Sequence, residues 1–151
     1  MKDKQLIVTA IKNGTVIDHI PSESLFSVIA ILGLDQIKTL ITFGNSLESK
    51  KLGKKGIIKV SEVFFSTEEI NKIALIAPTA KLNIIRDFEV VEKVKVEIPE
   101  KVTGIIKCVN PKCITNNEVV TTKFNVVSKE PIKLKCHYCE KITSRENLDM
   151  I

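Results

Sequence analysis

Several residue types are scarce in this sequence of 151 residues, and their scarcity limits what the chain can bind. It contains no Trp, one Tyr and two His, and Lys supplies all but two of its 23 basic residues. Stacking on nucleic-acid bases needs aromatic side chains, and arginine reads guanine edges and phosphates better than lysine does. The net charge of +5 therefore indicates a lysine-rich, solvated surface more than a nucleic-acid-binding one.

Long hydrophobic runs are also lacking. The longest apolar stretch covers residues 25–34 and is interrupted by Ser27 and Gly33, whereas a membrane-spanning helix needs about 20 apolar residues. The start, Met1–Lys4, shows no signal-peptide pattern. We therefore expect no membrane association and a cytoplasmic protein whose thiols stay reduced.

The composition changes close to Glu97–Lys101, where Pro99 separates two strand-like runs. All four cysteines follow this point. Residues 1–100 carry 14 basic and 13 acidic side chains, but residues 101–151 carry 9 and 5. We predict two domains, residues 1–99 and 100–151.

Hydrophobic periodicity predicts alternating strands and helices in the first domain. The pair Asn13-Gly14 favours a hairpin turn between a strand at Gln5–Lys12 and one at Thr15–Ile20. A helix begins after Pro21 and ends near Gly33, and a second begins with a capping box at Ser66 and ends at Pro78. Further strands are expected at residues 37–43, 57–61, 81–86 and 88–98, with a loop over residues 44–56.

This order of elements suits an antiparallel sheet with helices packed on one face. We predict an α+β chain: an N-terminal ferredoxin-like α/β sandwich followed by a small all-β domain of the zinc-ribbon type. Strand-like runs at Val119–Val127 and Ile132–Lys135 supply the second domain's sheet.

The cysteines are spaced C-x4-C and C-x2-C, with 22 residues between the pairs: Cys108, Cys113, Cys136 and Cys139. Two close pairs of thiolates are typical of a tetrahedral zinc site. Two disulfides or an iron–sulfur centre are the alternatives. Four thiolates leave no open position on Zn²⁺, so we predict one structural ion per chain, with His137 as a bystander.

Catalytic patterns are not evident. Four sulfur ligands disfavour a metalloenzyme, and two histidines offer little for nucleophilic catalysis. The pair Asp18-His19 and the lysines at 50, 51, 54, 55 and 59 are read as surface groups, and the lysine cluster matches no P-loop. From the chemistry alone, the chain is a two-domain zinc protein that could bind an anion.

Short segments in a specific order add a resemblance. They are Ala10–Pro21, Gly56–Val60, Ala74–Pro78, Asn83, Glu89–Val91 and Leu134–Glu140 together with the C-x4-C pair. Across nearly its whole length the sequence resembles the aspartate carbamoyltransferase regulatory chain family.

The resemblance implies a non-catalytic, allosteric regulatory subunit in pyrimidine biosynthesis. It implies that the first domain binds nucleoside triphosphates such as CTP and ATP and forms a self-dimer. It also implies that the zinc domain docks the catalytic chain, so that regulatory dimers bridge catalytic trimers. A nucleic-acid-binding zinc-ribbon protein is the alternative.

The resemblance also assigns residues. Backbone of Val8, Thr9, Ala10 and Ile11 would meet the base, Asp18 the ribose, Lys59 the ribose or base, and Lys93 and His19 the phosphates. Lys55 and Asn83 would lie at the edge of a pocket lined by Val16, Ile85, Phe88 and Val90. Asn110, Lys112 and Glu140 would face the catalytic chain. Thr9 and Phe88 depart from the family pattern, which leaves the inhibiting and activating nucleotides undecided.

Overall fold

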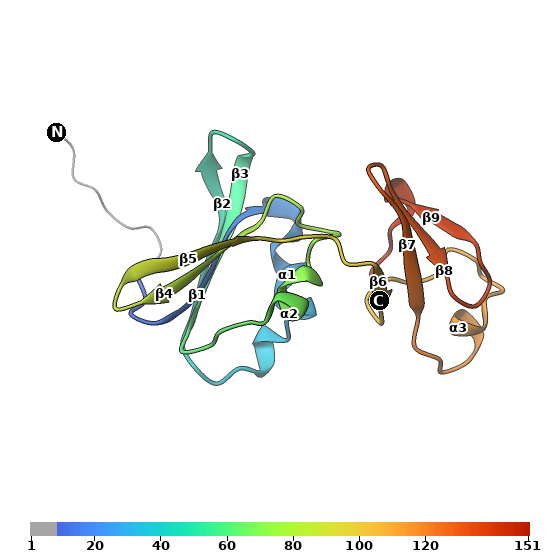
Figure 1. The fold of residues 1–151 in the computed structure, drawn as a ribbon, viewed down its shortest axis with the longest axis horizontal. Coiled ribbons are helices and arrows are strands. Elements are labelled where there is room, and N and C mark those ends of the chain that lie inside the picture. The colour runs from blue at the N-terminus through green and yellow to red at the C-terminus, as the bar shows by residue number, and fades with distance from the viewer. Residues whose placement is uncertain (1–8) are drawn as a thin grey trace. The chain divides into compact units, whose positions relative to one another are not determined.

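The computed structural model describes residues 9–151, which divide into two compact units. The N-terminal unit extends to Glu97 and the C-terminal unit covers Ile98–Ile151. Figure 1 shows each unit built around its own sheet. Among the described residues, no helix has the length and hydropathy that spanning a membrane would require.

The N-terminal unit is a five-stranded antiparallel sheet with two short helices. Its strands are β1 (Gly14–Pro21), β2 (Ile41–Ser49), β3 (Gly53–Ser61), β4 (Lys81–Arg86) and β5 (Glu89–Lys95), in the order β2-β3-β1-β4-β5. The helices are α1 (Leu25–Ile31), between 3₁₀ turns at Ser22–Ser24 and Leu34–Gln36, and α2 (Thr67–Asn71). The order of the first four strands is that of a ferredoxin-like sandwich, with β5 added beside β4, so the predicted fold class is confirmed.

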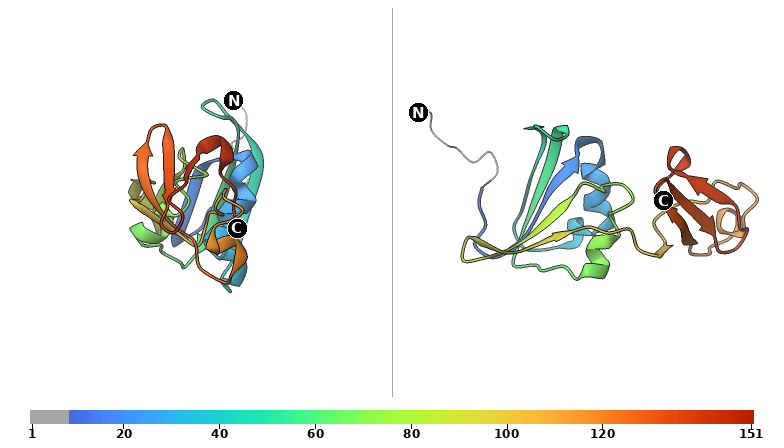
Figure 2. Two further views of the ribbon diagram at one scale, coloured as in Figure 1. Left: turned by 90° about the vertical axis from the view of Figure 1, so that its right-hand side faces the viewer. Right: turned by 45° about the horizontal axis from the view of Figure 1, so that its top comes forward.

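Both helices pack on the same face of this sheet (Figure 2, right). The core between helices and sheet is apolar and is formed by Ile17, Ile20, Leu25, Val28, Leu34, Ile58, Val60, Ile70, Ile73, Ala77, Ala80 and Leu82. Side chains alternate between the two faces of a strand. The neighbours of these core residues therefore point to the face away from the helices, which we call the open face.

The end of α1 and the start of α2 lie where the sequence predicted them, but the predicted end of the second helix at Pro78 is wrong, because α2 ends at Asn71. Gly33 adopts a φ of 65°, which a glycine tolerates without strain, just after α1. At α2 the Ser66 hydroxyl accepts a hydrogen bond from the Glu69 N–H at 3.2 Å, and the Glu69 carboxylate accepts one from the Ser66 N–H at 3.1 Å. The chain passes from α2 into turns after Asn71, yet Ile73 remains fully buried.

The predicted hairpin at Asn13-Gly14 is wrong. Strand β1 is central and pairs with β3 on one side and β4 on the other, so neither edge is left for a preceding strand. Residues 9–12 are not in a strand, and Gln5–Val8 lie outside the described residues.

The predicted loop at residues 44–56 is also wrong. Strands β2 and β3 extend through most of it and form a hairpin whose tip is only residues 50–52. A bulge between Gly44 and Leu47, with Ser46 at a φ of 57°, interrupts the alternation that would have revealed the strand. The strand expected at 37–43 accordingly begins at Ile41, and a tight turn at Asp87 and Phe88 separates β4 from β5.

The C-terminal unit is a small antiparallel sheet, as predicted. Its elements are β6 (Lys101–Thr103), α3 (Ile114–Asn117), β7 (Lys123–Lys129), β8 (Ile132–Cys136), β9 (Ile142–Ser144) and a 3₁₀ turn at Arg145–Asn147, with the sheet order β6-β7-β8-β9. Phe124, Leu134 and Ile106 are fully buried in or beside this sheet. With Ile132 and Val102, which are also buried, these residues make a small core, and units of this size commonly need further stabilisation.

Gly14 is required where β1 begins. Its φ is 140°, and an added Cβ would collide with the Val60 carbonyl oxygen and lie 3.0 Å from the Glu62 nitrogen. We predict that Gly14→Ala lowers the free energy of unfolding by about 2 kcal/mol or more. Gly53→Ala is the control, because it also has a positive φ but meets no atom within 4 Å. Urea denaturation compares the two, and equal losses would contradict the role of close packing at Gly14.

Candidate functional site

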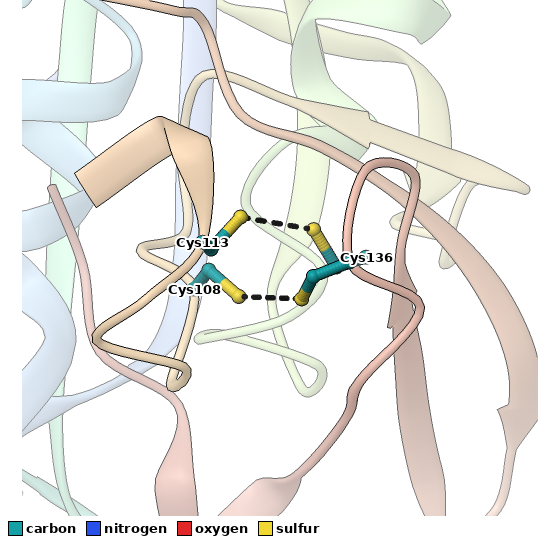
Figure 3. A group of neighbouring side chains, drawn as sticks. Cys108, Cys113 and Cys136 are labelled. Carbon is teal, nitrogen blue, oxygen red and sulfur yellow. Dashed lines mark hydrogen bonds between the residues drawn. The ribbon is translucent and has the colours of Figure 1, made fainter. Parts of the chain in front are cut away.

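The four cysteines lie together in the C-terminal unit. Cys108 and Cys113 come from the loop before α3, Cys136 is the last residue of β8, and Cys139 lies in the turn between β8 and β9. The Cys108 and Cys139 sulfurs are 3.6 Å apart and those of Cys113 and Cys136 are 3.7 Å apart (Figure 3). All four sulfurs lie within 4.8 Å of one another.

This geometry fits one zinc ion. Four sulfurs at about 2.3 Å from Zn²⁺ would lie about 3.8 Å from one another, close to the 3.6 and 3.7 Å separations found here. Within the described residues all four cysteines are free thiols, three of them buried, so no disulfide competes. Soft thiolates select zinc over hard cations such as Mg²⁺ or Ca²⁺.

The surroundings of the four thiols shift their pKa values in different directions. Burial raises the pKa of Cys108 to about 12 and also raises the pKa of Cys136. At Cys139, burial is outweighed by hydrogen bonds, first from the Lys141 backbone N–H, and the pKa falls to about 7. A divalent cation would favour the thiolate form of all four, so metal binding releases protons.

Three asparagine side chains hold the first metal-binding turn in shape. The Asn110 Oδ1 accepts a hydrogen bond from the Lys112 N–H at 3.0 Å. The Asn116 amide donates to the Cys108 and Asn110 carbonyls at 3.0 and 2.7 Å, and the Asn117 amide donates to the Cys113 carbonyl at 2.8 Å. Sequence reasoning missed Asn116 and Asn117, although asparagine side chains three and four residues after Cys113 are of the kind that bonds to loop backbone.

The second turn is held by backbone contacts. Glu140 adopts a φ of 64°, and its N–H donates to the Cys136 carbonyl at 3.0 Å. Its carboxylate is exposed and lies 3.8 Å from the Lys135 ammonium. His137 packs edge-to-face on Tyr138, with ring centroids 5.0 Å apart, and the candidate ligand group contains sulfur only.

A second group of polar residues lies on the open face of the N-terminal unit. Strand register places one residue from each strand in a single line across the sheet: Thr42, Lys59, Val16, Asn83 and Lys93, in spatial order. Directly opposite residues of antiparallel strands share a face. Four of these five are predicted site residues, and we call the line the cross-sheet row.

Asp18 lies on β1 beside this row and binds two neighbouring groups. Its Oδ1 accepts the Lys55 ammonium at 2.8 Å and the His19 backbone N–H at 2.7 Å. His19 has a φ of 59°, and its Nδ1 lies 3.6 Å from the Asp18 Oδ2. Within residues 9–151, the buried Nδ1 has no hydrogen-bond partner.

The electrostatics of this end of the open face favour an anion. Burial lowers the pKa of His19, and the charges of Lys55, Lys81 and Lys51 lower it further against the opposing effect of Asp18. Burial likewise lowers the pKa of Lys59, with Asp18 acting in the opposite direction. Cations are thus gathered around a single carboxylate, and a bound polyanion would offset their repulsion.

An apolar patch adjoins these groups. Ile11, Val16 and Ile85 are buried in one small cluster, with Ile57 packed against it. Phe88 and Val90 are exposed at its rim, around the β4–β5 turn. Predicted lining residues and predicted polar residues therefore share the open face.

In the segment before β1 only the predicted strand is wrong. Thr9 and Ala10 are exposed and Thr9–Ile11 are not in a strand, because both edges of β1 are occupied, whereas contact of their backbone with a base stays a prediction. Val8 lies outside the described residues. Ile11 contributes its side chain to the apolar patch.

Two family models cover the chain. The allosteric domain of the aspartate carbamoyltransferase regulatory chain matches residues 6–97, and the metal binding domain of the same chain matches residues 100–149. The chain belongs to the aspartate carbamoyltransferase regulatory chain family.

Regulatory chains from several organisms are similar in sequence to this chain over nearly its whole length. The regulatory chain of Phocaeicola vulgatus is 61% identical over 97% of this chain and 94% of its own length. That of Bacteroides fragilis is 58% identical over 99% of each, and that of Pyrococcus furiosus is 56% identical over 95% and 96%. The resemblance drawn from the sequence is confirmed, and the nucleic-acid alternative is not favoured.

The protein is thus an allosteric regulatory chain of aspartate carbamoyltransferase with an allosteric and a metal-binding domain. The four cysteines lie in the metal-binding domain, and their chemistry and spacing suit one structural zinc.

Loss of one sulfur ligand tests the metal site. We predict that Cys136→Ser abolishes stoichiometric zinc binding and unfolds the C-terminal unit, because its thin core relies on metal-binding free energy. The N-terminal unit should keep its cooperative unfolding transition. Elemental analysis and calorimetric melting check both outcomes, and a parent protein without stoichiometric metal would contradict the assignment.

Proposed function

We propose that this chain is a non-catalytic adaptor whose N-terminal unit binds nucleoside triphosphate effectors, such as CTP and ATP, on the open face of its sheet. Its C-terminal unit, held by zinc bound to Cys108, Cys113, Cys136 and Cys139, docks a catalytic chain. The observation that carries the nucleotide proposal is the cross-sheet row. Lys59, Val16, Asn83 and Lys93 come from four strands and share one line on the open face.

The cross-sheet row suggests how the nucleotide lies across the sheet. Neighbouring strands are about 4.8 Å apart, so Lys59 on β3 and Lys93 on β5 are separated by roughly 14 Å of sheet. An extended nucleotide can span that distance, with its sugar or base near Lys59 and its phosphates near Lys93. Asn83 lies between the two lysines in the row. Phosphate oxygens and lysine form charge-assisted hydrogen bonds, which are the stronger kind.

Asp18 is placed to bind the sugar. Its carboxylate accepts from Lys55 at 2.8 Å, and a carboxylate retains further acceptor sites for ribose hydroxyls. The apolar patch of Ile11, Val16 and Ile85 offers a surface for the base, with Phe88 and Val90 at its rim. We place His19 near the phosphates of the nucleotide and Lys55 at the edge of the pocket.

Control of the catalytic chain follows from linkage. A nucleotide shifts the assembly between two states only by the difference between its affinities for them. Couplings of this kind are usually about 1–3 kcal/mol. The proposed effector site and the metal site belong to different units, so control requires that nucleotide binding in one unit changes how the other unit acts on the catalytic chain.

Docking is assigned to the two metal-binding turns. Lys112 and Glu140 are exposed and Asn110 is half-buried on these turns, whose backbone is fixed by the hydrogen bonds described above. A rigid, polar surface of this kind suits a specific protein contact. The chain itself is assigned no catalytic role, because four sulfurs leave zinc no open position for a substrate.

Self-association is assigned to the β2 edge of the N-terminal unit. Strand β2 ends the sheet, and Phe26 and Phe43 stand beside this edge 65% and 48% exposed, with ring centroids 5.9 Å apart. Leu40 is 67% exposed just before the strand. The opposite edge, β5, carries charges at Glu89, Glu92, Lys93 and Lys95, which protect an edge strand from pairing.

A cytoplasmic location suits the four free thiols.

The phosphate assignment predicts a selective loss. Lys93→Ala removes a charge-assisted hydrogen bond and should weaken nucleoside triphosphate binding by about 1.5–3 kcal/mol. Binding of the corresponding nucleoside should change far less. Lys72→Ala removes an exposed lysine away from the open face and should leave both affinities unchanged. Calorimetry that showed equal losses for nucleotide and nucleoside would contradict the assignment.

His19 predicts a pH dependence. Its pKa is lowered in the free protein, so the ring is largely neutral at pH 7, and a nearby triphosphate would raise that pKa. Binding should therefore take up a proton, and affinity should fall as the pH rises from the free to the bound pKa of His19. Calorimetry in buffers of different ionisation enthalpy measures this uptake. His19→Gln should reduce it, and an unchanged uptake in that variant would show that the proton goes elsewhere.

A further inference from the structure

Thr42 is the one member of the cross-sheet row that neither the sequence nor the resemblance singles out. Its neighbours Ile41 and Phe43 face the helices, since Ile41 packs against the core and the Phe43 ring packs edge-to-face against Phe26 of α1. Thr42 therefore faces the open side. It lies directly opposite Lys59, the residue assigned to the sugar or base of the effector.

The Thr42 hydroxyl is buried and unsatisfied. Its Oγ1 is closed to solvent and has no hydrogen-bond partner within residues 9–151. Such an oxygen loses its hydration and gains nothing in return, whereas valine would fill nearly the same space without a polar atom. The buried hydroxyl therefore costs stability, and its position opposite Lys59 on the open face points to a functional reason for keeping it.

Lys59 can supply the missing donor. Directly opposite residues have Cβ atoms about 4.5–5.5 Å apart, and the lysine side chain is long, with three rotatable N–H donors. Burial already lowers the pKa of Lys59, so an acceptor at its side would stabilise the charged form.

We propose that Thr42 is a positioning residue for Lys59. When a nucleotide draws the ammonium to its sugar or base, one N–H turns to the Thr42 Oγ1 and the others face the ligand. The hydroxyl thus fixes the direction of the remaining donors. This inference rests on the nucleotide site proposed above and adds a residue to it.

The test compares Thr42→Val, which removes only the hydroxyl, with Thr42→Ser, which keeps it. Titration calorimetry with CTP and with ATP should show binding weakened roughly three- to tenfold by valine and largely restored by serine, as expected for one hydrogen bond. Thermal unfolding without nucleotide should show the valine variant as stable as the parent or more stable. A residue important only for folding would lower both properties.

A double-mutant cycle shows whether Thr42 acts through Lys59. Adding Thr42→Val to Lys59→Ala should cause no further loss of affinity, because the donor is already gone. Thr143→Val is the matched control, since it removes another buried, unpartnered hydroxyl in the C-terminal unit and should leave nucleotide affinity unchanged.

The outcomes separate this inference from the site on which it rests. If Asp18→Ala and Lys59→Ala weaken nucleotide binding but Thr42→Val does not, the role of Thr42 is wrong and the site stands. An equal loss from Thr42→Val with and without Lys59 would also overturn it. If neither Asp18→Ala nor Lys59→Ala weakens binding, the proposed nucleotide site itself is wrong.

Discussion

The pairing of β1 on both edges is the constraint on which the N-terminal unit depends. It makes β1 the centre of the sheet and fixes the register of β3 and β4 against it. Alternation then sends Ile17 to the helices and Val16 to the open face. A slip of one residue would exchange the two faces, burying polar groups in the core and removing the cross-sheet row. The register of β1 with β3 and β4 therefore determines both the packing of the core and the arrangement of the proposed effector site.

The C-terminal unit depends on a different constraint. Its core is thin, and the two turns that meet at the sulfurs are shaped by Asn110, Asn116 and Asn117 on one side and by backbone contacts on the other. A structural ion can join these turns with the free energy that packing does not supply. The effector groups and the sulfur ligands thus share no side chain and no core, so each unit can be perturbed separately.

Local signals in the sequence predicted local structure well. The capping box at Ser66, the glycine at the end of α1 and the cysteine spacing each depend on a few neighbouring residues, and the structure contains all three features. The loop at 44–56 was wrong because the bulge between Gly44 and Leu47 interrupts the alternation of β2. The hairpin at Asn13-Gly14 was wrong because strand pairing joins β1 to two strands that are distant in sequence. For the same reason Thr42 was missed: only its register opposite Lys59 places it in the site. The nucleotide residues themselves came from family resemblance, since a lone Asp18-His19 pair has no specific pattern.

We assign nucleotide binding to the N-terminal unit and docking of the catalytic chain to the C-terminal unit. Removal of zinc from the assembled enzyme tests this separation of functions most directly. The complex of regulatory and catalytic chains is treated with a thiol-reactive mercurial, then sized on a column and assayed for activity and nucleotide binding. We expect regulatory chains to separate from active, nucleotide-insensitive catalytic subunits. The released chains should still bind nucleotide, because the proposed effector residues include no cysteine. A complex that persists without metal, or released chains that no longer bind nucleotide, would contradict this separation of functions.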